Sequence, residues 1–139
     1  MKYPATITPY KEISGYIVTF RDIPEAITQG NTPKEAIFSA QDALLTTIGF
    51  YFEDRRVVPL PSKPKQGDHL VELPVSVFAK VLLLNEMFTQ GMKRSVLAKK
   101  LGVSQSEINR LIDLKHTTKI DRIAQALNAM GKSLALSIR

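Results

Sequence analysis

The sequence predicts an α+β protein in two modules, a ββ(β)αβ module over residues 1–66 and an all-α module over residues 67–139. Three observations lead to this fold class. Apolar and polar residues alternate along the start of the chain with the period of a strand. A strong helix-start signal lies at Thr32–Glu35, and residues 95–112 have the glycine and small-residue spacing of a helix-turn-helix.

The first module begins with a predicted hairpin. The period-two alternation places its strands over residues 2–9 and 15–21, with a turn between them. Pro4 favours an edge position for the first strand, because proline cannot donate to a ladder of hydrogen bonds. A short third strand is expected over residues 26–29.

A long helix is predicted next. Thr32 is its expected N-cap, Pro33 its first residue, and Glu35 closes a capping box. The helix should run to about Glu53 and lay one apolar stripe on the sheet, consisting of Ile37, Ala40, Leu44, Ile48 and Tyr51. We assign the aromatic residues of this module mainly to its core: Tyr3, Tyr16, Phe20, Phe38, Phe50, Tyr51 and Phe52.

The boundary between the modules is predicted near residue 66. Arg55–Pro59 should turn the chain into a last short extended segment of the first module. Residues 59–67 then contain three prolines and a glycine, a composition that excludes a regular helix or a central strand. The second module is expected to begin with an extended stretch at 70–73 and a helix that Gly91 ends.

The second module contains the pattern of a helix-turn-helix of the Cro or phage-repressor kind. Gly102 can take the positive φ that closes the first helix. Ser104 is a good N-cap, with Glu107 completing a capping box, so the second helix should begin at Gln105. The residues assigned to the core of the motif are Ala98, Leu101, Gly102, Val103, Ile108 and Leu111.

The exposed face of the second helix of this motif carries side chains suited to duplex DNA. The N-terminal residues of a recognition helix meet base edges in the major groove, where Gln and Asn pair with adenine and Arg with guanine. We assign base reading to Gln105, Ser106, Asn109 and Arg110. We assign phosphate contacts to Lys93, Arg94, Ser95, Lys99, Lys100, Ser104, Lys115 and Lys119.

The end of the chain predicts self-association. A fourth helix, capped by Thr118 or Asp121, should stop at Gly131, and residues 133–138 alternate like a final strand. Such a strand would present an unpaired edge. Pairing of two edges across a two-fold axis predicts a homodimer or a higher even homo-oligomer.

Charge also divides the chain. Residues 1–70 hold eight basic and eight acidic residues, whereas residues 71–139 hold eleven basic and five acidic ones. The whole net charge of +6 therefore belongs to the C-terminal half. A basic module joined to a neutral one indicates two surfaces with different partners, and operator double-stranded DNA is the partner expected for the basic module.

Composition narrows the class of protein. A chain of 139 residues that is 44% apolar can bury a real core. It has no cysteine, which excludes a disulfide framework and a thiolate zinc site and makes a reducing cytoplasm the expected compartment. The longest apolar cluster, Val81–Leu84, is too short to span a bilayer, so no membrane partner is expected.

We predict no enzymatic activity, no metal site and no cofactor. A metal-dependent nuclease needs several carboxylates that converge on divalent ions. Here Glu35 is accounted for by helix capping, and Asp22 precedes a tight corner where aspartate is common. His69 and His116 have no second ligand or nucleophile at a useful spacing.

Seven short segments of the first module carry a more specific pattern: Tyr3–Pro9, Gly15–Phe20, Asp22–Ala26, Thr28–Thr32, Glu35–Ala36, Asp42–Leu44 and Pro59–Ser62. In these segments the chain resembles the HicB antitoxin family, and its whole length is similar to the helix-turn-helix-bearing branch of that family. The resemblance implies a partial ribonuclease-H-like fold in the first module, which would bind and mask a HicA-type toxin, a small RNA-cleaving protein. It also implies that the second module represses the operon.

Without that resemblance, the residues leave the role of the first module open. They lead to a neutral α/β module joined to a DNA reader, and this module could equally bind a metabolite. The alternative is therefore a transcriptional repressor that senses a small molecule. No glycine-rich phosphate loop or acid–base pair favours a particular ligand.

Overall fold

The computed structural model describes residues 1–138, apart from the side chain of Ile13. In chain order its elements are β1 (Lys2–Tyr10), a 3-10 turn (Lys11–Ile13), β2 (Gly15–Phe20), β3 (Ile27–Gly30), α1 (Pro33–Glu53), β4 (His69–Glu72), α2 (Val75–Gln90), α3 (Arg94–Leu101), α4 (Gln105–Ile112) and α5 (Ile120–Ala129). The chain forms two compact units, unit 1 (Met1–Leu73) and unit 2 (Pro74–Arg139). The strands belong to unit 1, together with α1, and the elements after β4 are helices, which confirms the predicted α+β class.

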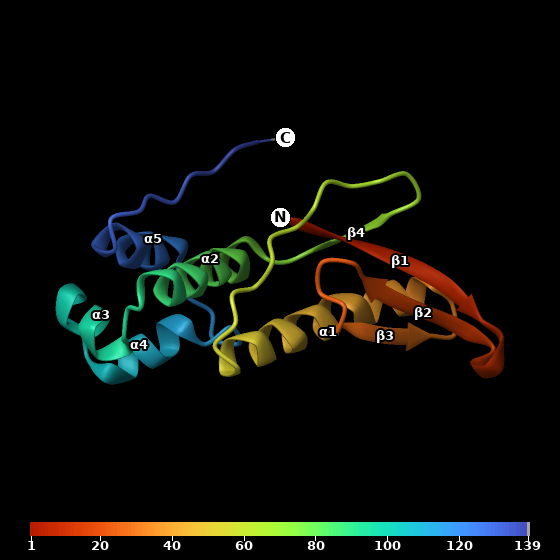
Figure 1. The fold of residues 1–139 in the computed structure, drawn as a ribbon, viewed down its shortest axis with the longest axis horizontal. Coiled ribbons are helices and arrows are strands. Elements are labelled where there is room, and N and C mark those ends of the chain that lie inside the picture. The colour runs from red at the N-terminus through yellow and green to blue at the C-terminus, as the bar shows by residue number, and fades with distance from the viewer. Residues whose placement is uncertain (139) are drawn as a thin grey trace. The chain divides into compact units, whose positions relative to one another are not determined.

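Unit 1 is a four-stranded antiparallel sheet with α1 lying along one face (Figure 1). The strand order is β3-β2-β1-β4, so β1 lies between two partners. Tyr10 stands opposite Gly15 in the β1–β2 hairpin, and Tyr3 stands opposite Val71 of β4. Tyr3, Ala5 and Val71 are buried, which places the apolar row of the alternation on the covered face.

The edge position predicted from Pro4 is wrong, because β1 is an inner strand. The register explains how an inner strand tolerates proline. Pairing between β1 and β2 extends from Tyr10 only to Ala5, whereas pairing with β4 includes Pro4. Pro4 therefore has a neighbouring strand on one side only, and its missing N–H removes no bond to β2.

The last strand of unit 1 is β4, and not a segment directly after Arg55–Pro59 as predicted. Residues 55–68 are irregular but attached to the sheet. The Tyr3 hydroxyl donates to the Pro59 carbonyl at 2.8 Å, and the Ser62 N–H and hydroxyl both donate to Asp22 Oδ2 at 3.0 Å. Because β4 completes the sheet, unit 1 ends at Leu73 rather than at residue 66.

Helix α1 has the predicted limits. The Thr32 Oγ1 atom accepts from the Glu35 N–H at 3.1 Å, and the Glu35 carboxylate accepts from the Asn31 N–H at 3.0 Å, one residue earlier than in a standard capping box. The buried stripe consists of Ala36, Ala40, Leu44, Ile48 and Tyr51. Ile37, predicted in this stripe, is only half-buried.

Two aromatic side chains of α1 do not belong to the core. Phe38 is 86% exposed and Phe50 is 56% exposed, whereas Tyr3, Phe20 and Tyr51 are buried as predicted. Phe38 lies two residues from Ala36, which is about 200° around a helix and therefore on the side away from the sheet. Exposed aromatic side chains of this kind are available for contact with another molecule.

Gly30, at the end of β3, has no room for a side chain. A Cβ atom at this position would lie 2.4 Å from the backbone N of Ala36 and 2.8 Å from its Cα. Gly30→Ala is expected to destabilise the protein by about 1–3 kcal/mol, because β3 would have to move away from α1. Gly49→Ala is the matched control, since its Cβ meets nothing within 4 Å and alanine favours the interior of α1. Urea unfolding of both variants tests this, and an equal effect of the two would contradict it.

Asp68 links the irregular segment to Arg21, the residue directly after β2. Both of its carboxylate oxygens accept from the Arg21 guanidinium, at 2.9 and 2.8 Å, and one also accepts from the Lys65 N–H at 2.6 Å. The hydrogen bond to Arg21, then that to Lys65, lowers the pKa of Asp68 from its usual 3.8 to about 2.

A lowered pKa predicts a defined acid dependence. The ionised Asp68 stabilises the fold above pH 3.8, and this stabilisation is expected to be lost as the pH falls to about 2. Acid unfolding followed by circular dichroism should show this component in the wild type and not in Asp68→Asn. Identical pH profiles for the two proteins would contradict the prediction.

In the part of unit 2 that the structure describes, four helices enclose an apolar core. Helix α2 packs against α4 and α5, and α3 packs against α4 and α5. Gly91 and Gly102 end α2 and α3 in the same left-handed conformation, with φ of 64° and 68°. Neither Thr118 nor Asp121 caps α5, whose N-cap is Lys119 without a side-chain hydrogen bond.

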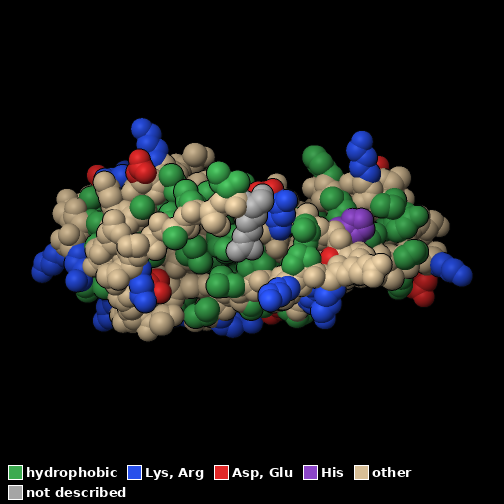
Figure 2. Space-filling model, turned by 90° about the horizontal axis from the view of Figure 1, so that it is seen from above, with side chains coloured by type: hydrophobic (Ala, Val, Ile, Leu, Met, Phe, Trp, Pro, Cys, Tyr) green, Lys and Arg blue, Asp and Glu red, His purple; other side chains and the backbone are tan. Residues whose placement is uncertain are grey.

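Residues 133–138 form no strand, contrary to the prediction. The segment leaves α5 as an irregular extended stretch, with Leu136 72% exposed and Ile138 fully exposed (Figure 1). Seen from the side that carries this segment, unit 2 shows apolar side chains, in green, at its surface (Figure 2). A strand requires a second strand to pair with its N–H and C=O groups, and within residues 1–138 no other strand pairs with this segment.

Candidate DNA-binding surface

The turn between α3 and α4 consists of a left-handed glycine that ends one short helix and a serine that caps the next. The Gly102 N–H donates to Lys99 O at 3.3 Å and the Val103 N–H to Ala98 O at 3.0 Å, so two of the last four carbonyls of α3 find backbone partners in the turn. The Ser104 hydroxyl then accepts from the Glu107 N–H at 3.2 Å. Both predicted limits, the end of α3 before Gly102 and the start of α4 at Gln105, are confirmed.

Burial within the motif departs from the predicted pattern at two positions, because Gly102, assigned to the core, and Val96 are both exposed. Among the residues assigned to its core, Ala98, Ile108 and Leu111 are buried, and Leu101 and Val103 are half-buried. Val96, expected on the apolar stripe of the first helix, is exposed. The small side chain of Ala98 allows close approach of α3 and α4.

The side chains assigned to base reading all lie exposed on α4; they are Gln105, Ser106, Asn109 and Arg110. The Asn109 Oδ1 atom accepts from Gln105 Nε2 and from Arg94 Nη1 of α3, each at 3.4 Å. The structure thus brings the start of α3 beside the exposed face of α4. Arg110 differs from the other three, because it lines a pocket next to the helix.

Every residue assigned to phosphate contact is exposed: Lys93, Arg94, Ser95, Lys99, Lys100, Ser104, Lys115 and Lys119. Lys93 and Ser104 are the N-caps of α3 and α4, and Lys119 is the N-cap of α5. With the boundary after Leu73, residues 74–139 hold eleven basic and four acidic residues, a net charge of +7, whereas residues 1–73 have a net charge of −1. Unit 2 is therefore the electropositive part of the chain.

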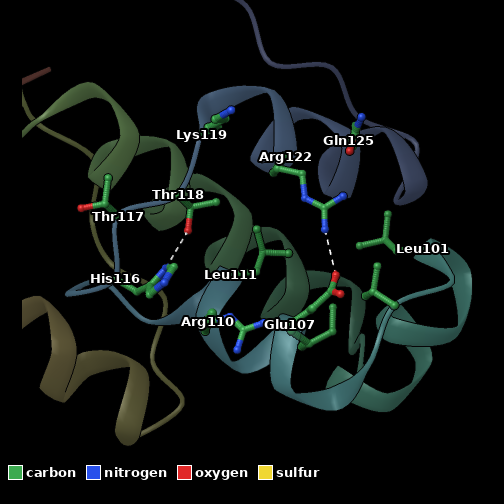
Figure 3. A pocket seen from close by; sticks show the side chains of 12 residues that line it. Leu101, Glu107, Arg110, Leu111, His116, Thr117, Thr118, Lys119, Arg122 and Gln125 are labelled. Carbon is green, nitrogen blue, oxygen red and sulfur yellow. Dashed lines mark hydrogen bonds and ion pairs between the residues drawn. The ribbon is translucent and has the colours of Figure 1, made fainter.

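A pocket of about 320 Å³ opens between α4, the 113–119 loop and α5 (Figure 3). Across it the Arg122 guanidinium donates to the Glu107 carboxylate at 2.9 Å. Glu107 therefore connects α4 with α5 and does not close the capping box predicted for it. On the loop, His116 Nδ1 and Thr118 Oγ1 lie 3.3 Å apart.

A buried lysine that the sequence analysis missed lies behind α4. Lys80 of α2 is 1% exposed, and its Nζ atom donates to the carbonyls of Asp113 at 2.7 Å, Arg110 at 3.2 Å and His116. Burial lowers the pKa of the Lys80 ammonium, and the charge of Asp113 opposes that shift. A signal was present in the sequence, because Lys80 interrupts the apolar run Phe78–Leu84.

The carboxylates of unit 1 do not converge. Asp22 accepts from Ser62, and Glu25 accepts from the Tyr51 hydroxyl at 2.6 Å and from Arg56 at 3.1 Å. The hydrogen bond from Tyr51 is the largest cause of the lowered pKa of Glu25. Across residues 1–138, no group of three or more His, Asp or Glu is arranged to hold a metal ion.

Comparison with known proteins decides the family. A family model described as a HicB-like antitoxin of bacterial toxin–antitoxin systems matches residues 2–82. The chain belongs to the HicB antitoxin family. Antitoxin HicB of Escherichia coli K12 is 50% identical over 136 residues, 98% of each chain. Antitoxin HicB 1 of Photorhabdus laumondii is 46% identical, over 99% of this chain and 87% of the relative.

The match with HicB relatives extends through both units. Antitoxin HicB of Pseudomonas fluorescens, at 36% identity, covers 84% of this chain and 81% of its own length. The family model spans unit 1 from its second residue onward and the first part of α2. Within residues 1–138 of this HicB-family chain, none of the helices combines the length and apolar character that a membrane crossing requires.

Proposed function

We propose that unit 1 binds and neutralises a small HicA-type toxin that cleaves mRNA, and that unit 2 represses transcription of the operon encoding both proteins. The observation that carries the first half is the match to the HicB-like antitoxin model, which covers residues 2–73 of unit 1. Because partner and operator are both encountered inside the cell, the proposed activity is cytoplasmic.

The second half rests on the geometry and charge of unit 2. Its α3–α4 turn is that of a helix-turn-helix, and exposed Gln105, Ser106 and Asn109 lie on the α4 face beside Arg94. A net charge of +7 over residues 74–139 favours binding to phosphates. We propose that these side chains, with Arg110, read bases. The exposed lysines of α3 and of the 113–119 loop would contact the phosphate backbone of the DNA.

We further propose that the protein acts as a homodimer or a higher even oligomer. Leu134, Leu136 and Ile138 alternate with small residues on a segment that has no strand partner within residues 1–138. Pairing with the same segment of a second copy would satisfy the backbone and cover these side chains. A two-fold dimer would present two copies of α4 to a palindromic operator.

A non-catalytic role agrees with the family and with the local roles of the carboxylates. Asp22 and Glu25 hold the 55–68 segment and the end of α1 in place, so they are engaged in the fold. We therefore propose inhibition of the toxin by binding alone. Purified protein incubated with RNA and magnesium is expected to leave the RNA intact.

Co-expression tests the antitoxin function. The short open reading frame adjacent to this gene is expressed alone, with the full chain, with residues 1–73, or with residues 74–139. We expect the neighbour alone to arrest growth, and the full chain or residues 1–73 to relieve the arrest and co-purify with a tagged neighbour. Residues 74–139 should bind upstream DNA without relieving growth arrest.

The opposite outcome identifies the alternative function. A harmless neighbour that does not co-purify would contradict the antitoxin function and favour a repressor whose first unit senses a metabolite. Thermal stabilisation of residues 1–73 by a small molecule would then be the decisive observation.

A further inference from the structure

The buried ammonium of Lys80 lies against backbone carbonyls at the end of α4, the proposed recognition helix. Among the residues that the structure describes, Lys80 is the buried residue that carries a charge, and it is 1% exposed. An ammonium has three N–H donors. All three find backbone carbonyls, those of Arg110, Asp113 and His116, and the distance to Asp113 O is 2.7 Å.

These carbonyls mark the last turn of α4 and the loop that follows it. Arg110 lies in the last turn of α4, Asp113 is its C-cap, and His116 lies midway along the 113–119 loop. The C-terminal carbonyls of a helix lack partners within the helix and carry partial negative charge. One cation from α2 therefore neutralises the end of α4 and fixes the path of the loop.

Both segments that Lys80 holds carry candidate DNA contacts. Helix α4 presents Asn109 and its neighbours, and the 113–119 loop presents Lys115 and Lys119. The loop is otherwise fastened by short-range bonds, such as that from the Lys115 N–H to Asp113 Oδ1 at 2.9 Å. Such local bonds shape the loop but do not set its position relative to α2.

We infer that Lys80 is a positioning residue for DNA recognition. Its buried ammonium holds the end of α4 and the 113–119 loop in one arrangement, so that base-facing and phosphate-facing side chains reach the same duplex together. This inference rests on the proposed DNA-reading function of unit 2. It assigns to α2, which carries none of the proposed DNA contacts, a part in operator specificity.

Lys80→Met tests the inference, because methionine keeps an unbranched apolar side chain and removes all three donors. Lys80→Gln retains an amide that can donate to two carbonyls. Met87→Ala is the control, since Met87 is buried on the same helix but lies about 10 Å further along its axis. Affinities for upstream DNA and for random DNA of equal length are measured by fluorescence anisotropy. Each protein variant is measured at the same number of degrees below its own melting temperature.

We expect Lys80→Met to lower the affinity for upstream DNA by about tenfold or more and to reduce the preference over random DNA by a similar factor. The affinity and the preference of Lys80→Gln should lie between those of Lys80→Met and the wild type. Met87→Ala should retain the preference for upstream DNA even if it is destabilised as much as Lys80→Met. An unchanged preference in Lys80→Met and Lys80→Gln would overturn the inference.

Amide hydrogen exchange separates this inference from the DNA-binding function itself. In the full-length wild type, the amides of residues 113–118 should exchange slowly, and in Lys80→Gln they should exchange faster than the amides of α2. Slow exchange of these amides in a wild type that does not prefer upstream DNA would refute the proposed function, but it would leave intact the role of Lys80 in holding the loop. Equal exchange rates in the wild type and in Lys80→Gln would refute that role. If Lys80→Met fails to fold, the Lys80→Gln measurements decide.

Discussion

Ending the chain after Gly131 is expected to leave a monomer whose affinity for operator DNA is lower by about 100-fold or more. In the proposed dimer, two copies of α4 bind one palindromic site, and the second contact is strengthened by the first. The segment 133–138 has apolar side chains at alternate positions and pairs with no strand in the part of the chain that the structure describes. Removing it removes the proposed dimer contact. Light scattering after gel filtration and anisotropy on operator DNA measure both effects.

A matched pair of substitutions separates this contact from a general effect of truncation. Leu136→Asp and Ser137→Asp add the same charge at adjacent positions, but only Leu136 belongs to the apolar row with Leu134 and Ile138. We expect Leu136→Asp to reproduce the monomer and Ser137→Asp to remain largely dimeric. A truncated protein that dimerises as well as the full chain would remove this segment from the proposed interface.

Asn109→Ala is expected to lower the affinity for operator DNA by about 1–3 kcal/mol, and to change the affinity for random DNA little. Asn109 is exposed on α4 and lies 3.4 Å from both Gln105 and Arg94. An amide on this face can pair bidentately with adenine, and its loss should relax specificity at one base pair. Binding to a set of operators with single base changes, read by anisotropy, identifies that position.

Lys99→Ala is the control for Asn109→Ala. Lys99 is exposed in the last turn of α3 and is assigned to phosphate contact. Its replacement should weaken binding to operator and random DNA alike. It should also lower by about one the number of counterions released on binding, which is read from the dependence of the affinity on salt concentration. Equal losses on both kinds of DNA for Asn109→Ala would refute its role in base reading.

The turn between α3 and α4 was predictable from the sequence because its determinants are local. A glycine that takes φ of 68° and a serine that caps the next helix act within one or two turns of their own position. Glu107 shows the limit of that approach. Its spacing from Ser104 is that of a capping box, yet its carboxylate pairs with Arg122, a residue of α5.

In unit 1, too, the features set by neighbouring residues were predictable and those set by long-range pairing were not. Alternation predicted β1 and β2, and the Thr32–Pro33 signal predicted the start of α1. The position of β4 was not predictable in this way, because residues 69–72 pair with β1, more than sixty residues earlier in the chain. That pairing makes β1 an inner strand, moves the end of unit 1 to Leu73 and attaches residues 55–68 to the sheet.

The sequence by itself determined the α+β class, the limits of α1, the end of α3, the start of α4, the separation of charge and, by resemblance, the HicB family. Only the tertiary structure decided which strand closes the sheet, that Phe38 and Phe50 lie outside the core, and that Lys80 holds the end of α4. Helix caps and strand periods depend on neighbours in sequence, so a sequence displays them directly. A buried charge acquires its role from carbonyls about thirty residues away, and packing alone brings those groups together.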